Sequence, residues 1–373
     1  MNKIRKYLRS IKKLPKTLDV YRSKPAAKYP FDITIECSGT CNLRCKHCIF
    51  SEYMKRGKGI IKFEDFKKLF DKLDLKSIEL INFAGYGEPL INPEIAKIVR
   101  YVGTRNKKIN KYLVTNAVLL NKEMSRKLIL VGLDEIYISF DGATKKTYEK
   151  IRRGSRFELV LENIKDLIKL KKEMSSRKPK IIIYFTLMKD NISELAKMTE
   201  LVDRLGIEIQ ILPLVIRRDK EDMDISLKGM SKENIRKHIN EAIKKAKKLK
   251  NKKILAELEK IKKTGGMTEA SGTWDNAPCY SPWTTCFITW DGEILPCCHF
   301  WDGQISYGNL FNGNFNELWN SKTARNFRKN CVKGKRNTLC ARCGNQNSES
   351  YKKFCMITKI LPVLKNFSDR SYK

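Results

Sequence analysis

The sequence predicts an α/β protein built on a parallel sheet, followed by a smaller cysteine-rich domain. Over residues 32–214, six short runs rich in β-branched residues alternate with amphipathic segments of helical length. This alternation is typical of repeated βαβ units. Six units are too few to close an eight-fold barrel, so we expect a partial (β/α)6 barrel of the TIM type.

Each expected element follows from its local pattern. The strands are expected at residues 32–37, 77–83, 112–116, 135–140, 180–188 and 207–214. Apolar residues at helical spacing predict the helices between them. These helices are expected at residues 63–73, 93–103, 122–131, 157–174 and 191–205. In parallel α/β folds the chemistry lies at the carboxyl ends of the strands, and the motifs described below follow such ends.

The remaining chain divides by composition around this core of residues 31–215. Residues 1–30 are basic, and residues 216–270 form a lysine-rich helical bridge with an apolar stripe. From residue 271 to 350 the sequence becomes rich in Trp, Cys, Gly and Asn. This composition indicates a small domain organised by its cysteines rather than by a large core. Residues 351–373 form a C-terminal tail.

Composition excludes two classes of protein, secreted disulfide scaffolds and membrane channels. No apolar run approaches the 18 residues of a membrane span, and the first residues, MNKIRKYLRSIKK, lack the apolar centre of a secretory signal. We therefore expect a cytoplasmic protein. Its twelve cysteines should bind metal, do redox chemistry or fill the core rather than form disulfides.

The chain is strongly basic, with 76 Lys and Arg residues against 41 Asp and Glu residues and a formal net charge of +35. Two interpretations stay open, a general compositional bias and an anionic partner such as a nucleotide, RNA or a lipid headgroup. In the N-terminal segment the apolar residues share one helical face. They are Ile4, Tyr7, Leu8, Ile11 and Leu14. Such a helix can contact an anionic membrane surface peripherally, or dock its apolar stripe on the barrel.

The strongest chemical signal is the CxxxCxxC loop directly after the first expected strand, Cys41-Asn-Leu-Arg-Cys45-Lys-His-Cys48. Three thiolates on one short loop can converge on one metal centre. A [4Fe–4S] cluster held by three cysteines leaves one iron open to a small molecule, and the spacing favours this interpretation. Two alternatives remain, a fourth ligand from Cys37 and a Cys3His zinc site that uses His47.

The second expected strand ends in the turn Ala84-Gly85-Tyr86-Gly87-Glu88-Pro89. The two glycines let a ligand approach the backbone closely. A carboxylate beside them can accept hydrogen bonds from an ammonium group. This turn alone is a weak signal, but its combination with the cysteine loop is specific.

Together these features resemble the radical S-adenosylmethionine (radical SAM) superfamily. The resemblance covers residues 30–215 and rests on the CxxxCxxC loop, the GxGEP turn and six βα units in this order. It implies that Cys41, Cys45 and Cys48 hold a [4Fe–4S] cluster whose open iron binds SAM.

The resemblance also implies a set of residues that contact SAM. The set comprises Gly85, Gly87, Glu88, Pro89, Asn116, Ser139 and His47. The turn residues would contact the amino end of the SAM methionine, with the proline fixing the turn, and the histidine would lie near the adenine. The asparagine and serine follow the third and fourth strands and would bind the SAM carboxylate or ribose. Asp141 and Arg152 are weaker candidates.

The cysteine-rich region resembles the auxiliary-cluster domains called SPASM and twitch. Cys279 is followed by twelve residues, Gly292, four residues and Cys297, and later by Cys340-Ala-Arg-Cys343. The chain departs from the full SPASM pattern because the CX5CX3C continuation after Cys343 is missing. The resemblance implies one auxiliary [4Fe–4S] cluster ligated by Cys279, Cys297, Cys340 and Cys343.

Three cysteines of this region are left over, Cys286, Cys298 and Cys331. They are expected to be small buried residues, and a swap of Cys286 or Cys298 for one of the four ligands stays open. A zinc ribbon is a further alternative for the region. It would use Cys297, His299, Cys340 and Cys343.

The resemblance implies an enzyme that cleaves SAM reductively to a 5′-deoxyadenosyl radical and abstracts hydrogen from its substrate. An electron donor such as flavodoxin or ferredoxin would supply the electron. A fully ligated auxiliary cluster can remove the electron left after abstraction, which favours an oxidation or a coupling.

We expect a small-molecule, sugar or lipid-linked substrate, and an anionic substrate stays open. The roughly 30 residues before the first strand are too few for the leader-binding domain of peptide modifiers. One alternative is a radical SAM/SPASM enzyme that modifies ribosomally made peptides (RiPPs). The alternative from another class is a zinc-binding, nucleic-acid-binding protein without enzymatic activity.

Overall fold

The computed structural model describes residues 26–27, 29–49, 57–215, 219–266, 279, 281–300, 303–332 and 340. The predicted basic N-terminal helix, the C-terminal tail and two cysteines, Cys343 and Cys355, lie outside the described residues. Within the described ranges the protein has the mixed α/β fold that the sequence predicts.

The strands of the described residues form one open sheet of eight strands. Their order is β6-β5-β4-β3-β2-β1-β7-β8, and every neighbouring pair is parallel except β7–β8. The strands are β1 (Asp32–Ile35), β2 (Leu80–Phe83), β3 (Asn110–Thr115), β4 (Glu135–Ser139), β5 (Lys180–Leu187), β6 (Glu208–Pro213), β7 (Thr285–Ile288) and β8 (Ile294–Leu295). The first six strands coincide with the six predicted runs, and the sheet does not close. The predicted partial barrel is therefore confirmed.

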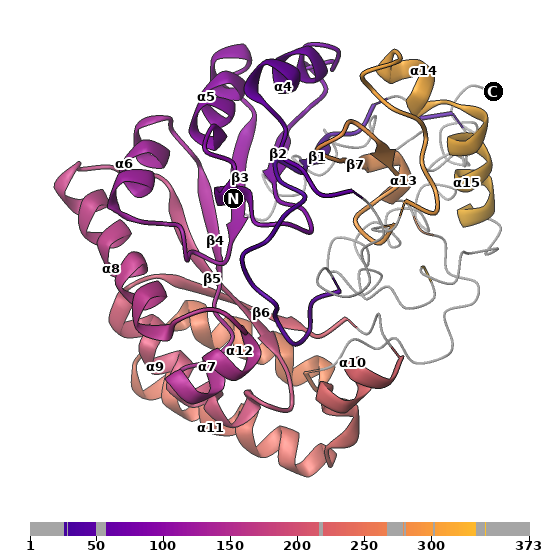
Figure 1. Ribbon diagram of the computed structural model, residues 1–373. Coiled ribbons are helices and arrows are strands. Elements are labelled where there is room, and N and C mark those ends of the chain that lie inside the picture. The colour runs from indigo at the N-terminus through magenta and orange to yellow at the C-terminus, as the bar shows by residue number, and fades with distance from the viewer. Residues whose placement is uncertain are drawn as a thin grey trace, which may run out of the picture.

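Helices follow the strands along the chain and lie on the outer side of the sheet (Figure 1). The α-helices are α4 (Phe63–Phe70), α5 (Ile95–Arg105), α6 (Lys122–Leu130), α7 (Lys145–Ile151), α8 (Phe157–Glu173), α9 (Leu195–Leu205), α10 (Asp219–Ile225), α11 (Lys232–Lys248), α12 (Lys252–Thr264), α13 (Ser281–Thr284), α14 (Phe315–Trp319) and α15 (Lys322–Val332). Short 3-10 turns are η1 (Pro89–Ile91), η2 (Ile192–Glu194) and η3 (Leu227–Gly229). The sequence patterns did not predict α7 and α10, because seven mostly polar residues show too little apolar periodicity.

The strands have two different faces because side chains alternate along each strand. Ile33 and Ile35 of β1 and Ile136 and Ile138 of β4 are buried, whereas the residues between them are half-buried. The apolar positions form the core under the helices. The alternate positions line the inner face of the partial barrel.

The lysine-rich bridge folds into α11 and α12, as its apolar stripe predicts. Helix α11 packs against α9, and α12 packs against α11 and β6. The stripe residues are buried: Ile235, Ile239, Ala242, Ile243 and Ala246. The lysines that alternate with them are mostly exposed, so much of the positive charge of this segment lies on a solvated outer surface.

The C-terminal region is joined directly to the barrel sheet. Strand β7 pairs in parallel with β1 along its whole length, from Asp32 opposite Thr285 to Ile35 opposite Ile288. Residues of this region belong to the same continuous apolar core as the helices of the barrel. The barrel and the cysteine-rich region therefore share one sheet and one core.

Aromatic packing also stabilises the described part of the C-terminal region, in addition to its cysteines. The rings of Phe315 and Trp319 stack with centroids 5.8 Å apart. The buried guanidinium of Arg328 lies 4.4 Å from the Trp319 ring centroid, and its Nε donates to the carbonyl oxygen of Pro282 at 2.9 Å. Burial lowers the pKa of Arg328 to about 10. These aromatic residues extend the shared core into the C-terminal region.

A core substitution in β7 tests whether the two regions unfold together. Ile288 is fully buried, so Ile288→Ala should lower the free energy of unfolding by about 2–5 kcal/mol. All five tryptophans lie between residues 274 and 319, so fluorescence reports the C-terminal region while far-ultraviolet circular dichroism mainly reports the barrel helices. We expect both signals to shift together in one transition. Two separate transitions would contradict a shared core.

Candidate active site

The cysteine loop (residues 40–49) follows β1 at the carboxyl end of the sheet. Hydrogen bonds hold together the two chain segments at the base of the loop. In this loop base (residues 37–39 and 59–61), Ser38 and Ile60 form an antiparallel bridge, and Gly39 N–H donates to the Gly59 oxygen at 2.8 Å. The side chain of Asn92 donates to the carbonyl oxygens of both Cys37 and Ile61, at 3.0 and 2.8 Å. The base is therefore fixed by main-chain contacts and by the Asn92 side chain.

The turn between α7 and α8 supports the other side of the cysteine loop. The N–H groups of Arg44 and Lys46 donate to the oxygens of Arg153 and Ile151 at 2.9 and 2.8 Å. Between these two anchors lies Cys45, which is buried. The loop thus has little freedom at the middle thiol.

The predicted glycines of the GxGEP turn pack against the protein itself. A Cβ on Gly85 would lie 2.4 Å from the Glu36 side chain, and a Cβ on Gly87 would lie 2.3 Å from the Ser38 oxygen. The N–H of Glu88 donates to the Thr40 oxygen at 2.7 Å. The glycines therefore allow the turn to contact the start of the cysteine loop, a role that the spacing alone did not indicate.

The Glu88 carboxylate is buried and connects the turn to the end of β3. Its Oε1 accepts from Leu90 N–H at 3.1 Å and from Thr115 Oγ1 at 2.6 Å, and its Oε2 accepts from Asn116 N–H at 2.8 Å. Burial raises the pKa of this carboxyl, and the three donors oppose the rise. Pro89 starts the 3-10 turn that follows.

Asn116 lies beside the cysteine loop. Its Nδ2 donates to Asn42 Oδ1 at 2.9 Å and lies 3.9 Å from Cys41 Sγ. The next residue, Ala117, has a φ of 58°, and Asn163 of α8 donates to its oxygen at 2.9 Å. The left-handed backbone of Ala117 and the hydrogen bond from Asn163 direct the Asn116 side chain towards the cysteine loop. The sequence patterns did not single out Asn42 or Asn163.

Arg152 and Asp141 form a buried ion pair on the other side of the loop. Arg152 Nε lies 2.6 Å from Asp141 Oδ2, and Asp141 Oδ1 accepts from Thr186 N–H at 2.7 Å. The Arg152 guanidinium is 3.8 Å from Cys45 Sγ. His47 Nε2 is 3.8 Å from the Asp141 carboxylate, and Ser139 ends β4 half-buried. The structure thus brings these candidates to one edge of the sheet.

Polar and aromatic side chains line the inner face of the partial barrel below this edge. The set, whose members are all half-buried, is Asp32, Thr34, Asn82, Tyr112, Glu135, Tyr137 and Tyr184. The Tyr137 ring lies between the rings of Tyr112 and Tyr184, with centroids 5.3 and 4.5 Å away, and its hydroxyl donates to Glu135 at 2.5 Å. Asn82 donates to Thr34 Oγ1 at 3.3 Å, while its buried Oδ1 accepts no hydrogen bond from the described part of the chain. This face therefore offers two carboxyl groups and one amide oxygen as acceptors, beside hydroxyl groups that can both donate and accept.

The described cysteines of the C-terminal region differ in exposure. Cys279, Cys297 and Cys340 are half-buried. Cys286 and Cys331 are buried, as expected for small core residues, whereas Cys298 is exposed. The fourth predicted ligand, Cys343, lies outside the described residues, and so does part of the predicted zinc ribbon.

Two family models match the chain in these two regions. The radical SAM superfamily matches residues 35–202, and an iron-sulfur cluster-binding domain, SPASM, matches residues 279–344. The first match contains the cysteine loop and the GxGEP turn, and the second spans Cys279 to Cys343. The chain is a radical SAM protein with a C-terminal SPASM domain.

Named relatives and solved structures agree with this family. The chain is 26% identical over 323 residues to the tungsten-containing aldehyde ferredoxin oxidoreductase cofactor-modifying protein of Pyrococcus furiosus. The aligned region covers 79% of this chain and 82% of that protein. The chain is also 26% identical over 335 residues to the AdoMet-dependent heme synthase of Methanosarcina barkeri, with 87% and 89% covered. The crystal structure of Streptococcus suis SuiB shares the fold, with a TM-score of 0.62, 14% identity, and 91% and 77% covered.

The radical SAM protein is therefore an enzyme, and its cofactors are a [4Fe–4S] cluster with SAM and an auxiliary cluster. The matches give no support to the non-enzymatic nucleic-acid-binding alternative. In the part of the chain that the structure describes, no helix is both long and apolar enough to cross a bilayer.

The donors around the cysteine loop fit a cluster better than a single ion. Among the described residues, no three His, Cys, Asp or Glu side chains converge on one point. A zinc ion needs such convergence, whereas each ligand of a cluster binds a different iron and the ligands lie farther apart. Burial raises the pKa of Cys41 to about 12 and of Cys45 to about 11, so cluster binding must release these protons.

Cys37 has a different environment from the three loop cysteines. It is buried in the apolar core, and its thiol donates to the Ile35 oxygen at 3.7 Å. Its neighbours are therefore those of a core residue rather than of a fourth ligand.

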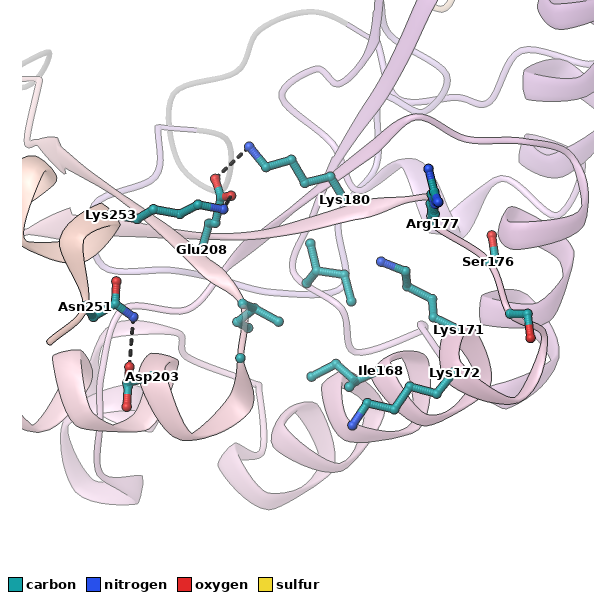
Figure 2. A pocket seen from close by; sticks show the side chains of 14 residues that line it. Ile168, Lys171, Lys172, Ser176, Arg177, Lys180, Asp203, Glu208, Asn251 and Lys253 are labelled. Atoms are coloured by element: carbon teal, nitrogen blue, oxygen red, sulfur yellow. Dashed lines mark hydrogen bonds and ion pairs between the residues drawn. The ribbon is translucent and has the colours of Figure 1, made fainter. Parts of the chain in front are cut away.

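A basic cavity of about 660 Å³ lies at the opposite end of the strands (Figure 2). Lys180 and Lys253 both pair with Glu208 at 2.6 Å. Lys171, Lys172 and Arg177 complete the positive lining. Lys180 starts the eight-residue strand β5, which spans roughly 25 Å, so the cavity lies at the amino ends of the strands and the cysteine loop at their carboxyl ends.

The half-buried carboxyl group of Asp32 predicts a pH-dependent stability. Burial raises its pKa from 3.8 to about 6, so between these values the native chain keeps a proton that the unfolded chain has lost. The contribution of Asp32 to stability therefore falls as the pH rises through this window. Asp32→Asn should increase the free energy of unfolding at pH 7.5 by roughly 1–3 kcal/mol, with a smaller gain at pH 5.

Urea unfolding at both pH values checks this expectation. Asp65→Asn, on the exposed surface of α4, is a matched control that should change stability little at either pH. An equal effect of Asp32→Asn at the two pH values would contradict the raised pKa.

Proposed function

We propose that the enzyme cleaves SAM at a cluster held by Cys41, Cys45 and Cys48 and oxidises a small polar substrate bound on the inner face. The observation that carries this proposal is the position of the cysteine loop directly at the carboxyl edge of a polar inner face. When bound, the cluster and SAM supply an electron and a hydrogen-abstracting 5′-deoxyadenosyl radical. The protein binds and orients SAM and the substrate, and it excludes water from the site.

The residues around the loop are suited to bind the polar ends of SAM. Asn116, between Asn42 and Cys41, offers amide groups beside the cluster site. The Arg152 guanidinium is fixed by Asp141, so its remaining N–H groups could pair with the SAM carboxylate at little entropic cost. Glu88 already accepts three hydrogen bonds, so we assign it a supporting contact to the SAM ammonium, with Gly85, Gly87 and Pro89 shaping the turn. Ser139 and His47 would face the ribose and adenine.

The auxiliary cluster would be ligated by Cys279, Cys297, Cys340 and Cys343 and would accept the electron that remains on the substrate after hydrogen abstraction. The pairing of β7 with β1 supports this route, because it joins the hairpin that carries Cys297 to the barrel sheet. A reductant is required, and flavodoxin or ferredoxin would suit the basic surface. Peripheral contact of the N-terminal segment with an anionic membrane remains a separate proposal.

The inner face favours a substrate rich in hydrogen-bond donors. Asp32, Glu135 and the buried Oδ1 of Asn82 are all acceptors, and the positive cavity lies at the far end of the strands. Hydroxyl or amino groups complement such a face, whereas an anionic group would be repelled there. A sugar or aminocyclitol alcohol, free or lipid-linked, fits this chemistry, and a ketone or aldehyde would be the oxidised product.

A RiPP-type peptide substrate is the second candidate. SuiB, which shares the fold, has been solved bound to its precursor peptide SuiA. In contrast, the named relatives from Pyrococcus furiosus and Methanosarcina barkeri are a cofactor-modifying protein and a heme synthase. Neither of these two names mentions a peptide, which is one support for a non-peptide substrate.

Two cysteine variants test whether the first cluster cleaves SAM and the auxiliary cluster is needed for substrate turnover. After anaerobic reconstitution, the wild type should contain about eight irons per chain and release 5′-deoxyadenosine when dithionite and SAM are added. Cys45→Ala should abolish this release, whereas Cys340→Ala should keep part of it and lose substrate turnover. Equal and complete loss of 5′-deoxyadenosine release in both variants would indicate that the auxiliary cluster has only a structural role. A wild-type protein without iron would refute the proposed function.

A substrate panel tests the acceptor-rich inner face. Aminocyclitols and sugars should stimulate 5′-deoxyadenosine release more than peptides do, and a deuterated carbinol position should transfer its label to 5′-deoxyadenosine. Asn82→Leu should reduce kcat/KM for the best substrate about tenfold, because it removes one buried acceptor. Unstimulated SAM cleavage should stay unchanged. Stimulation by peptides alone would favour the second candidate.

A further inference from the structure

The indole of Trp290 fills a slot between two glycines of the loop base. Trp290 lies in the turn between β7 and β8. A Cβ on Gly39 would lie 2.4 Å from its Cδ1, and a Cβ on Gly59 would lie 2.3 Å from its Cη2 and Cζ3. The indole N–H also donates to the Gly57 oxygen at 3.2 Å. The ring therefore leaves no room for any side chain at positions 39 and 59.

The ring, and not the backbone, requires glycine at these two positions. Neither Gly39 nor Gly59 has a positive φ, so alanine could adopt either backbone conformation without strain. The contact with Trp290 is thus the physical reason for both glycines. Two glycines in the radical SAM region are matched to one tryptophan of the SPASM region, more than 200 residues away (the separation from Gly57 is 233).

The slot lies at the point where the cysteine loop is closed. Gly39 N–H donates to the Gly59 oxygen at 2.8 Å, and Cys41 follows two residues after Gly39. The same hairpin that presents Trp290 continues through β8 to Cys297. One aromatic side chain therefore contacts the base of the first cluster loop from the hairpin that carries a predicted ligand of the second cluster.

We propose that Trp290 is a positioning residue that keeps the loop base closed and so maintains the spacing of Cys41, Cys45 and Cys48. This proposal rests on the proposed function, which assigns these three cysteines to the SAM-binding cluster. The half-buried indole contributes a large contact area with few rotatable bonds. Removing the indole would let the ends of the cysteine loop separate. The loop would then lose more conformational entropy when the cluster binds.

The test compares Trp290→Ala and Trp290→Phe with a matched control. The control is Phe311→Ala, because the Phe311 ring packs on Gly292 in the same hairpin turn, 2.5 Å from where a Cβ would stand. Phe311 follows β8 in the chain, so Phe311→Ala removes an aromatic side chain that packs on the hairpin turn and leaves Trp290, Gly39 and Gly59 in place. Each reconstituted protein is assayed for iron content, for SAM affinity and for the SAM-induced change in the electron paramagnetic resonance spectrum of its reduced clusters.

We expect Trp290→Ala to bind SAM at least about tenfold more weakly and to lose the SAM-induced spectral change, while the SAM-independent signal of the auxiliary cluster remains. Trp290→Phe should keep most of the response. Phe311→Ala should keep all of it, even if its Tm falls as far as that of Trp290→Ala. A wild-type response in Trp290→Ala, or an equal loss in Phe311→Ala, would overturn the proposal. No SAM response in the wild type would refute the proposed function itself, and this proposal with it.

A double-mutant cycle isolates the contact itself. Gly59→Ala alone should reproduce the loss of SAM response, because the methyl group displaces the ring. In the Trp290→Ala background the slot is empty, so adding Gly59→Ala should cause little further loss. Fully additive losses would show that the two positions act independently and would overturn the assignment.

Discussion

The buried carboxylate of Glu88 is the interaction on which the site depends. A buried carboxylate is stable only when donors surround it, and here the donors come from the 3-10 turn after Glu88 itself and from the end of β3. The Glu88 N–H in turn donates to the cysteine loop at Thr40. The parallel sheet makes this possible because it brings the carboxyl ends of successive strands to one edge.

Support for the cysteine loop comes from three directions, and only two of them belong to the barrel. The GxGEP turn packs on its beginning, and the α7–α8 turn is hydrogen-bonded to its middle. The third support is the β7–β8 hairpin, whose Trp290 covers the loop base. Because β7 also pairs with β1, the SPASM region forms part of the framework of the active site. The contact between β7 and β1 therefore supports the cysteine loop and also lies on the route proposed for the electron.

The excess positive charge and the proposed substrate-binding face lie in different parts of the molecule. Most of the excess lysine lies on exposed helix surfaces such as that of α11, opposite its buried stripe. The inner face instead presents the carboxyl groups of Asp32 and Glu135 and the amide oxygen of Asn82, which are hydrogen-bond acceptors by their chemistry. A net charge of +35 therefore does not imply an anionic substrate, since the groups that would meet the substrate have the opposite character.

The sequence by itself determined the six strands, most of the helices and the chemical identity of the site, because all of these depend on local patterns. Alternation along strands, apolar spacing along helices and three cysteines within eight residues are readable without the fold. Only the tertiary structure decided which partners meet. The pairing of β7 with β1, the donors around Glu88, the burial of Cys37 and the match between Trp290 and its two glycines join residues far apart in the chain. Such contacts are set by how the packed elements exclude water and fill space, which no local pattern records.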